Sequence, residues 1–210
     1  MRLQQGIEDL PGIAVTTINL ATAYHRLGDG AAARRLLDAV LDDKTGLFPP
    51  ATRSEAAFRR AVMGLDAGET TEALANLSLA RNLCAQPCRL ETGLLNVEGR
   101  LALATGDHAQ ARALATAARD RAEPTERDEQ ANAIRIIAAA DALAGQLDAA
   151  LAGFQNALAR DKELAAGDRI IGDLEAIADI LTRLGRYEDA KTYRQRAAAV
   201  REARRQSSPE

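Results

Sequence analysis

Apolar and polar residues alternate with a helical period along most of the chain. The segment TAYHRLGDGAAARRLLDAVL, residues 22–41, is amphipathic on both sides of a single break at Gly28-Asp29-Gly30. Apolar side chains that recur every three or four residues place one apolar stripe on each helix. No segment shows the sustained alternation of β-branched and polar residues that is typical of strands. The sequence therefore predicts an all-α fold of amphipathic helices joined by sharp turns.

The same break recurs along the chain at a nearly constant spacing. Five glycines each follow one helix-like segment and precede another: Gly28, Gly68, Gly106, Gly145 and Gly185. Successive glycines are 40, 38, 39 and 40 residues apart. Glycine suits the residue just past a helix end, because the backbone there adopts a positive φ that strains any residue with a Cβ atom. The sequence therefore predicts five helical hairpins with a period near 39 residues.

Small residues stand at fixed distances from each of these glycines. Five positions after the glycine, every unit has alanine: Ala33, Ala73, Ala111, Ala150 and Ala190. The residues seven positions before it and twelve after it are also small, apart from Val40. Positions separated by whole helical turns share one face, so these small side chains would let the two helices of a hairpin approach closely. We interpret them as packing positions rather than as sites of chemistry.

This spacing of a small residue, a turn glycine and two alanines resembles the tetratricopeptide repeat (TPR), as the last unit shows with Ala178, Gly185, Ala190 and Ala197. The resemblance, to bacterial TPR-like repeat proteins, covers about residues 15–203. It implies an α-solenoid, a right-handed superhelix of about five TPR-like hairpins, forming a single domain over residues 1–210. The hairpins are expected at about residues 12–42, 53–84, 89–122, 127–162 and 168–204.

The sequence departs from the TPR pattern in three respects, the first of which is that the aromatic positions of the repeat are mostly aliphatic residues or alanine. Its period is longer than the usual period of about 34 residues, which implies longer helices or loops. Arg60 and Glu98 stand at positions where the family usually places an apolar residue.

Composition and charge argue against nucleic-acid binding and against a membrane-spanning helix. The 210 residues are 47% hydrophobic with three Phe, three Tyr and no Trp, and they are rich in alanine, which favours closely packed helices. The net charge is −3, and basic residues are interspersed with acidic ones until the last helix, so the basic patch of a nucleic-acid-binding protein is missing. No segment approaches the ~20 apolar residues of a membrane span. We expect neither nucleic acid as a partner nor a membrane-spanning helix.

The N-terminal segment bears on the compartment. MRLQQGIEDLPGI has no apolar run and no small-residue cleavage site, so it is unlike an export signal. The sequence as given therefore predicts a cytoplasmic protein by default. The segment is also like the interior of a longer chain, and an export signal preceding Met1 would instead make the protein periplasmic.

The resemblance also implies which residues would bind a partner. In helical-repeat arrays of this kind the first helix of every hairpin lines a concave surface, the groove. Nine residues are expected to face it: Thr22, His25, Arg59, Asn96, Arg100, Asn132, Arg135, Glu175 and Asp179. Arg59, Arg100 and Arg135 would form a ladder of planar donors for the carboxylates of an extended peptide or of its C-terminus. The alternative is that these arginines are ordinary solvated residues of helix surfaces.

The two cysteines leave two structures open. Cys84 and Cys88 are separated by three residues in the segment CAQPC, and neither histidine stands at a ligand-like spacing from them, so we expect no zinc site and no other metal site. The pair is either two free thiols or a disulfide, which a separation of four around Pro87 permits. A disulfide would suit an exported protein.

Motifs of the common enzyme classes are missing from the sequence. There is no GxSxG, no phosphate-binding glycine loop and no HExxH, and neither histidine forms a triad-like arrangement with a Ser or Cys. We therefore expect no enzyme and no cofactor. The leading prediction is a protein-interaction scaffold that holds a peptide or helical segment of another protein in its groove. Two alternatives are a peptide-sensing regulatory domain of a larger system and an assembly module that self-associates into a homo-oligomer through its end helices.

Overall fold

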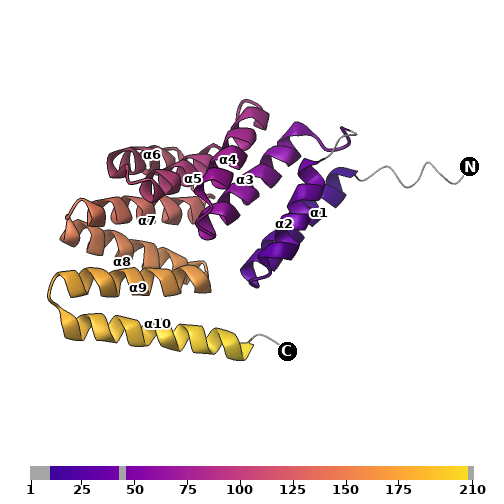
Figure 1. Ribbon diagram of the computed structural model, residues 1–210. Helices are drawn as coiled ribbons and strands as arrows, with labels where there is room; N and C mark the ends of the chain where they lie inside the picture. The colour runs from indigo at the N-terminus through magenta and orange to yellow at the C-terminus, as the bar shows by residue number, and fades with distance from the viewer. Residues whose placement is uncertain (1–9, 43–45, 208–210) are drawn as a thin grey trace, which may run out of the picture. The chain divides into compact units, whose positions relative to one another are not determined.

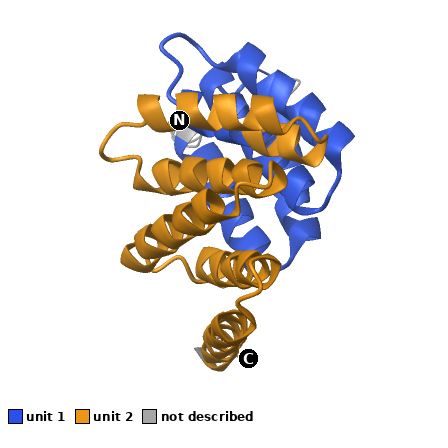
Figure 2. Cartoon of the chain, turned by 90° about the vertical axis from the view of Figure 1, so that its left-hand side faces the viewer, with its two compact units in different colours: residues 1–97 blue, residues 98–210 orange. Residues whose placement is uncertain are grey.

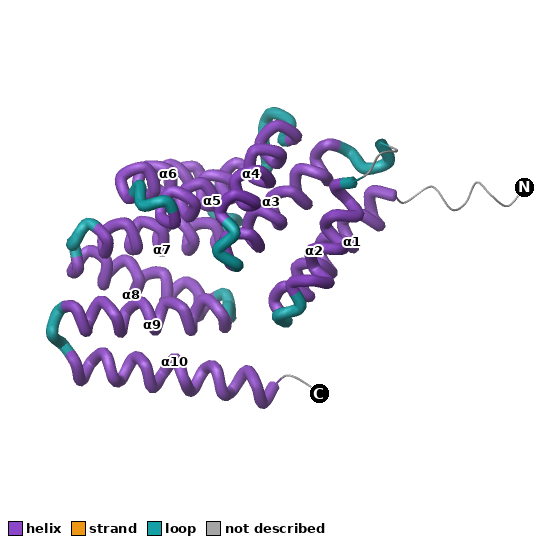
Figure 3. Tube along the Cα trace, viewed as in Figure 1, coloured by secondary structure: helices purple, strands orange, loops and turns teal. Residues whose placement is uncertain are grey.

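The computed structural model, which describes residues 10–42 and 46–207, is built from α-helices (Figures 1 and 3). In those residues there are ten helices and no strand. The helices are α1 (Leu10–Arg26), α2 (Gly30–Leu41), α3 (Pro50–Asp66), α4 (Thr70–Leu83), α5 (Glu91–Ala104), α6 (His108–Arg121), α7 (Arg127–Leu143), α8 (Leu147–Glu163), α9 (Gly167–Arg183) and α10 (Tyr187–Ser207).

The chain divides into two compact units, residues 1–97 and 98–210, with the boundary inside α5 (Figure 2). Unit 1 contains the hairpins α1/α2 and α3/α4, and unit 2 contains α7/α8 and α9/α10. In unit 2 the end of α5 also packs against α6, because a Cβ atom built on Gly99 would lie 3.4 Å from the carbonyl oxygen of Ala111. The single domain predicted for residues 1–210 stays a prediction.

The five glycines on which the repeat was based all occupy hairpin turns. Each first helix ends two residues before its glycine, and each second helix begins two residues after it. All five glycines have a positive φ, between 75° and 86°. In every turn the backbone N–H of the residue after the glycine donates to the carbonyl oxygen five residues earlier, as in the bond of 2.9 Å from Asp29 to Tyr24. This is the hydrogen bond of a Schellman motif, so the predicted helix ends are confirmed.

The predicted packing positions lie in the core. The alanine five residues after each glycine is at most 1% exposed in every hairpin. In unit 1, Ala33 packs with apolar side chains such as Ile18, Leu37 and Met63, and Ala73 lies against Gly64 of α3. In unit 2 the core contains Phe154, Leu174 and Ile177. Small residues at these points allow close contact between helices, as the sequence predicted.

The two cysteines are joined by a disulfide in the structure. Cys84 follows the end of α4, and its Cα atom lies 5.4 Å from that of Cys88. The bond closes the turn that leads from α4 toward α5. Of the two alternatives that the sequence left open, the structure has the disulfide.

Candidate functional site

The first helices of unit 1 border an open cleft of ≈ 300 Å³. Val15, Ile18 and Asn19 of α1 line one side of the cleft, and the other side is lined by three residues of α3: Ala51, Thr52 and Glu55. Ile18 is buried, whereas Val15 is exposed, so the cleft has an apolar floor and an open rim. Its remaining groups are an amide, a hydroxyl and a carboxylate. The cleft lies between two first helices, where the resemblance to TPR proteins implied that a partner would bind.

Arg59 lies one helical turn beyond the cleft on α3. Its Nε donates to Glu55 Oε1 over 2.8 Å, and its guanidinium carbon lies 5.3 Å from the centroid of the Phe58 ring. Both side chains of the ion pair are partly exposed. An exposed pair of this kind contributes only about 0.5 kcal/mol, so it opens at little cost when a competing charge arrives.

The other residues of unit 1 that were expected in the groove have partners within the chain or are enclosed. Thr22 Oγ1 donates to the carbonyl oxygen of Ile18 over 2.9 Å. His25 Nε2 lies 2.8 Å from Asp66 Oδ2, at the far end of α3. Asn96 is buried. Of these residues, His25 and Thr22 are the two on α1 that remain partly exposed.

In unit 2, three of the residues expected in the groove make polar contacts with neighbouring side chains. Two of these contacts are with α10, and one lies within α7. Glu175 Oε1 accepts from Arg201 of α10 over 2.5 Å. The exposed Asp179 lies 3.5 Å from Arg194 of the same helix. Asn132 Oδ1 accepts from Arg135 over 3.0 Å. The fourth expected residue, Arg100, is half-buried.

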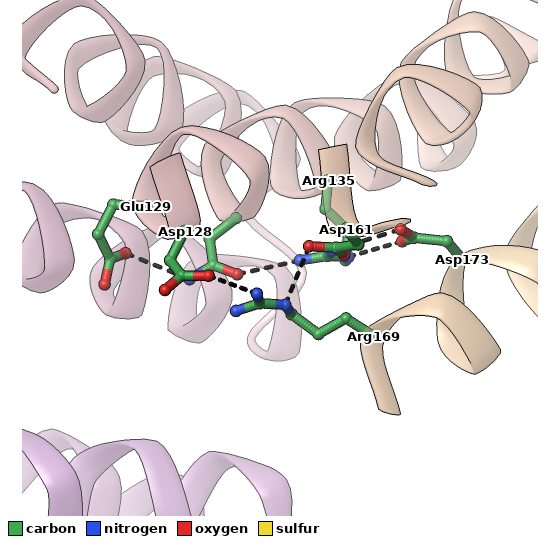
Figure 4. Close-up of polar contacts among 7 residues, drawn as sticks. Asp128, Glu129, Arg135, Asp161, Arg169 and Asp173 are labelled. Carbon is green, nitrogen blue, oxygen red and sulfur yellow. Dashed lines mark hydrogen bonds and ion pairs between the residues drawn. The ribbon is translucent and has the colours of Figure 1, made fainter. Parts of the chain in front are cut away.

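Arg135 belongs to a buried ion network rather than to an open surface (Figure 4). Its Nε donates to Asp173 Oδ1 over 2.7 Å, and its Nη2 also contacts Asp173 Oδ2 over 3.3 Å. The same Nη2 donates to Asp161 Oδ2. The side chains of Asp161 and Asp173 are both 0% exposed. The guanidinium of α7 therefore joins the end of α8 to the middle of α9.

A second arginine completes this network from the start of α9. Arg169 Nε lies 3.0 Å from Asp161 Oδ1, and its Nη2 contacts the exposed carboxylate of Asp128. Two buried carboxylates thus face two guanidinium groups. Removing one partner of a buried pair leaves an uncompensated charge, which costs about 3–5 kcal/mol. The network therefore fixes the packing of α7, α8 and α9.

The pKa of Asp173 is raised from its ordinary value to about 6. Burial is the main cause, because it disfavours the charged form of the carboxyl. The hydrogen bonds and charge of Arg135 lower the pKa, and the nearby carboxylate of Asp161 raises it again. The carboxyl of Asp173 is therefore half protonated near pH 6.

Sequence patterns did not predict this network, although one signal was present. Asp173 stands twelve residues before its turn glycine, where the three preceding units have the buried residues Ala56, Leu94 and Ala133. An aspartate at a position where these three units bury an apolar residue is the signal that could have indicated a buried partner. Arg60 in unit 1 is a related case, since it lies 2.9 Å from Asp38 and 2.7 Å from Glu72. These two ion pairs explain its place at a position where the TPR family usually has an apolar residue.

The part of the chain that the structure describes shows no cluster of three or more His, Cys, Asp or Glu side chains placed to hold a metal ion. Among the same residues, none of the helices combines the length and the apolar character needed to cross a bilayer.

The chain matches no protein-family model and shows no significant similarity to a curated protein. Its fold is nevertheless similar to solved structures of helical-repeat proteins. A structure described as putative kinesin light chain nearly identical TPR-like repeats, from Podosopora anserina, has a TM-score of 0.57 at 18% identity over 94% of this chain and 99% of the other. The fold is TPR-like. BtubC (BKLC) from P. vanneervenii has a TM-score of 0.60 at 14% identity over 99% and 91% of the two chains.

A third similar solved structure is MamA, residues 41 to the end, from Desulfovibrio magneticus RS-1. Its TM-score is 0.53 at 16% identity, over 94% of this chain and 98% of the other. At these identities the similarity shows the fold alone. It agrees with the all-helical hairpins and with the resemblance inferred from the sequence.

Proposed function

We propose that this protein is a protein-interaction scaffold that binds a peptide segment of a partner against the first helices of its hairpins. The observation that supports the proposal best is the cleft between α1 and α3. Repeat arrays use the surface lined by their first helices for binding, and this cleft lies on that surface in unit 1. The TPR-like fold is consistent with such a role.

The lining of the cleft indicates the chemistry of the bound segment. Val15, Ile18 and Ala51 offer apolar contact to one partner side chain of modest size. Asn19 and Thr52 carry donors and acceptors that suit the backbone of an extended peptide. Glu55 adds a carboxylate, which favours a basic residue next to the apolar one in the partner. The proposed ligand is therefore a peptide with an apolar anchor flanked by Lys or Arg.

The ladder of three arginines is less well supported than the cleft. Arg135 is engaged by two buried carboxylates, so a peptide carboxylate would have to displace Asp161 or Asp173 to reach it. Arg59 has a weaker, exposed partner in Glu55. Within this proposal, Arg59 gives up its ion pair with Glu55, so that Glu55 can bind the partner. Arg135 instead stabilises the packing of helices in unit 2.

A peptide selection with a matched pair of variants tests the proposal. Peptides are selected from a random displayed library on the purified chain, and their affinity is measured by fluorescence anisotropy. Ala51→Phe fills the cleft from an exposed position of α3, so it should weaken binding at least about tenfold, because the apolar anchor loses its site.

The control is Ala75→Phe, the same change at an exposed position of α4 away from the cleft. It should leave the affinity unchanged, and both variants should keep the helical circular dichroism of the wild type. A selection that yields no saturable peptide would contradict the proposal. Equal effects of the two substitutions would do so as well.

A further inference from the structure

The first helix carries an apolar face that no other helix covers in the part of the chain that the structure describes. Ile13 is 53% exposed, Leu20 is 46% exposed and Tyr24 is 36% exposed, and Leu27, just past the end of α1, is 77% exposed. Successive members of this set are seven, four and three residues apart, which places them within an arc of about 60° on a helix. We call these four residues the outer face of α1.

The outer face is distinct from the two other faces of the same helix. Ala14, Ile18 and Ala21 are buried against the rest of unit 1. Val15 and Asn19 line the cleft. The seven-residue spacing of Ile13, Leu20 and Leu27 is the spacing with which apolar side chains pair between two helices. A partner on the outer face would therefore leave both the core and the cleft unchanged.

Charge decides which partner fits this face. The segment from Leu10 to Tyr24, LPGIAVTTINLATAY, contains no charged residue. A partner that brought charges onto it would bury them without counter-ions, which is costly. A second apolar face without charges pairs with it at no such cost, and the α1 of another copy of this chain is such a face.

The other end helix does not offer a suitable partner surface. The exposed positions of α10 include charged residues along its length, among them Glu188, Lys191, Arg194 and Arg201. Stacking α1 of one copy on α10 of the next would desolvate these charges against apolar side chains. A head-to-tail chain of copies is therefore disfavoured, and a symmetric contact between two α1 helices is favoured.

We propose that two copies of this chain associate through the outer faces of their α1 helices, packed antiparallel about a twofold axis. Leu20 is the midpoint of the face, since Ile13 and Leu27 stand seven residues to either side of it. The axis then sets Leu20 against Leu20 of the second copy and Ile13 against Leu27 of the second copy. This interface goes beyond the proposed peptide binding, because it does not use the cleft.

A contact one helix wide is smaller than the ~800 Å² per partner of a standard interface, so the association is weak and depends on concentration. Sedimentation velocity over a roughly hundredfold range of protein concentration should show a monomer that converts to a dimer. Leu20→Glu and Leu20→Lys should each remain monomeric over the same range, because each sets two like charges against one another at the axis. An equimolar mixture of the two variants should recover the dimer, because opposite charges then meet.

The matched control is Leu74→Glu, which makes the same change at a leucine of α4 that is 52% exposed. This variant should dimerise like the wild type. Circular dichroism and the melting temperature of each variant show whether the fold is kept, and the recovery in the mixture does not depend on either. A wild type that stays monomeric throughout would overturn the proposal, since another segment or another protein would then cover the face. A dimer that survives Leu20→Glu, or is lost equally in Leu74→Glu, would also overturn it.

Discussion

At the scale of single residues, this fold depends on where side chains are absent as much as on where they are present. Glycine occupies the turns, where φ is positive, and it also occurs inside helices at points of close approach. Two glycines inside helices of unit 2 differ in how much room a Cβ atom would have. A Cβ atom on Gly153 of α8 would lie 2.7 Å from Ala138 Cβ, whereas one on Gly172 of α9 would meet nothing within 4 Å.

The two glycines predict opposite effects of the same substitution. Gly153→Ala should destabilise the protein by about 1–3 kcal/mol, because α7 and α8 must move apart to admit the methyl group. Gly172→Ala should stabilise it by about 0.5–1 kcal/mol, because alanine favours the helix and the site has room. Urea unfolding followed by circular dichroism measures both. Effects of the same sign would contradict the packing described for α7 and α8.

The raised pKa of Asp173 predicts that the stability of the folded protein depends on pH. Its pKa of about 6 in the folded protein exceeds the ordinary value of 3.8, so the folded state binds more protons than the unfolded chain between these two values. Stability from this group is therefore present at acid pH and is lost as pH rises from about 4 to 6. The shift of about two units corresponds to roughly 3 kcal/mol.

Asp173→Asn removes this titration while keeping the size of the side chain. The unfolding free energy of the variant relative to the wild type should therefore rise between pH 4 and 6 and then level off. Asp128→Asn, which removes an exposed carboxylate of the same network, controls for the loss of one negative charge. A difference between wild type and Asp173→Asn that is constant across this window would contradict the raised pKa.

At the scale of helices, the hairpins could be predicted from the sequence because the signals that end and join them are local. A turn glycine, a small residue one or two turns away and an amphipathic period are all readable within about 40 residues. The buried charges could not be predicted in the same way. Asp161 and Asp173 are ordinary helix-surface residues by type, and only contacts between α7, α8 and α9 enclose them.

The expected groove residues show the same limit. Position within the repeat indicated that Arg135 faces the groove, but it did not indicate that two acidic side chains from later helices would bind it. Similarly, the apolar outer face of α1 has the pattern of a core helix. The pattern specifies that a face is apolar, and only the structure shows that the described residues leave it uncovered.

Across the whole chain, different surfaces of the TPR-like fold have different proposed roles. The cleft between α1 and α3 is proposed to bind a peptide, and the outer face of α1 is proposed to bind a second copy. The ion network of unit 2 stabilises packing between helices. These roles are separable, since Ala51→Phe should leave self-association unchanged and Leu20→Glu should leave peptide affinity unchanged.

In the proposed function, a partner segment binds to the first helices of the hairpins. Hydrogen exchange of the purified chain, with and without a saturating selected peptide at fixed protein concentration, tests it most directly. Binding at this site should slow the exchange of backbone amides in α1 and α3 around residues 15–19 and 51–55, and it should leave exchange in α4 unchanged. Protection confined to the second helices, or no protection at saturation, would contradict it.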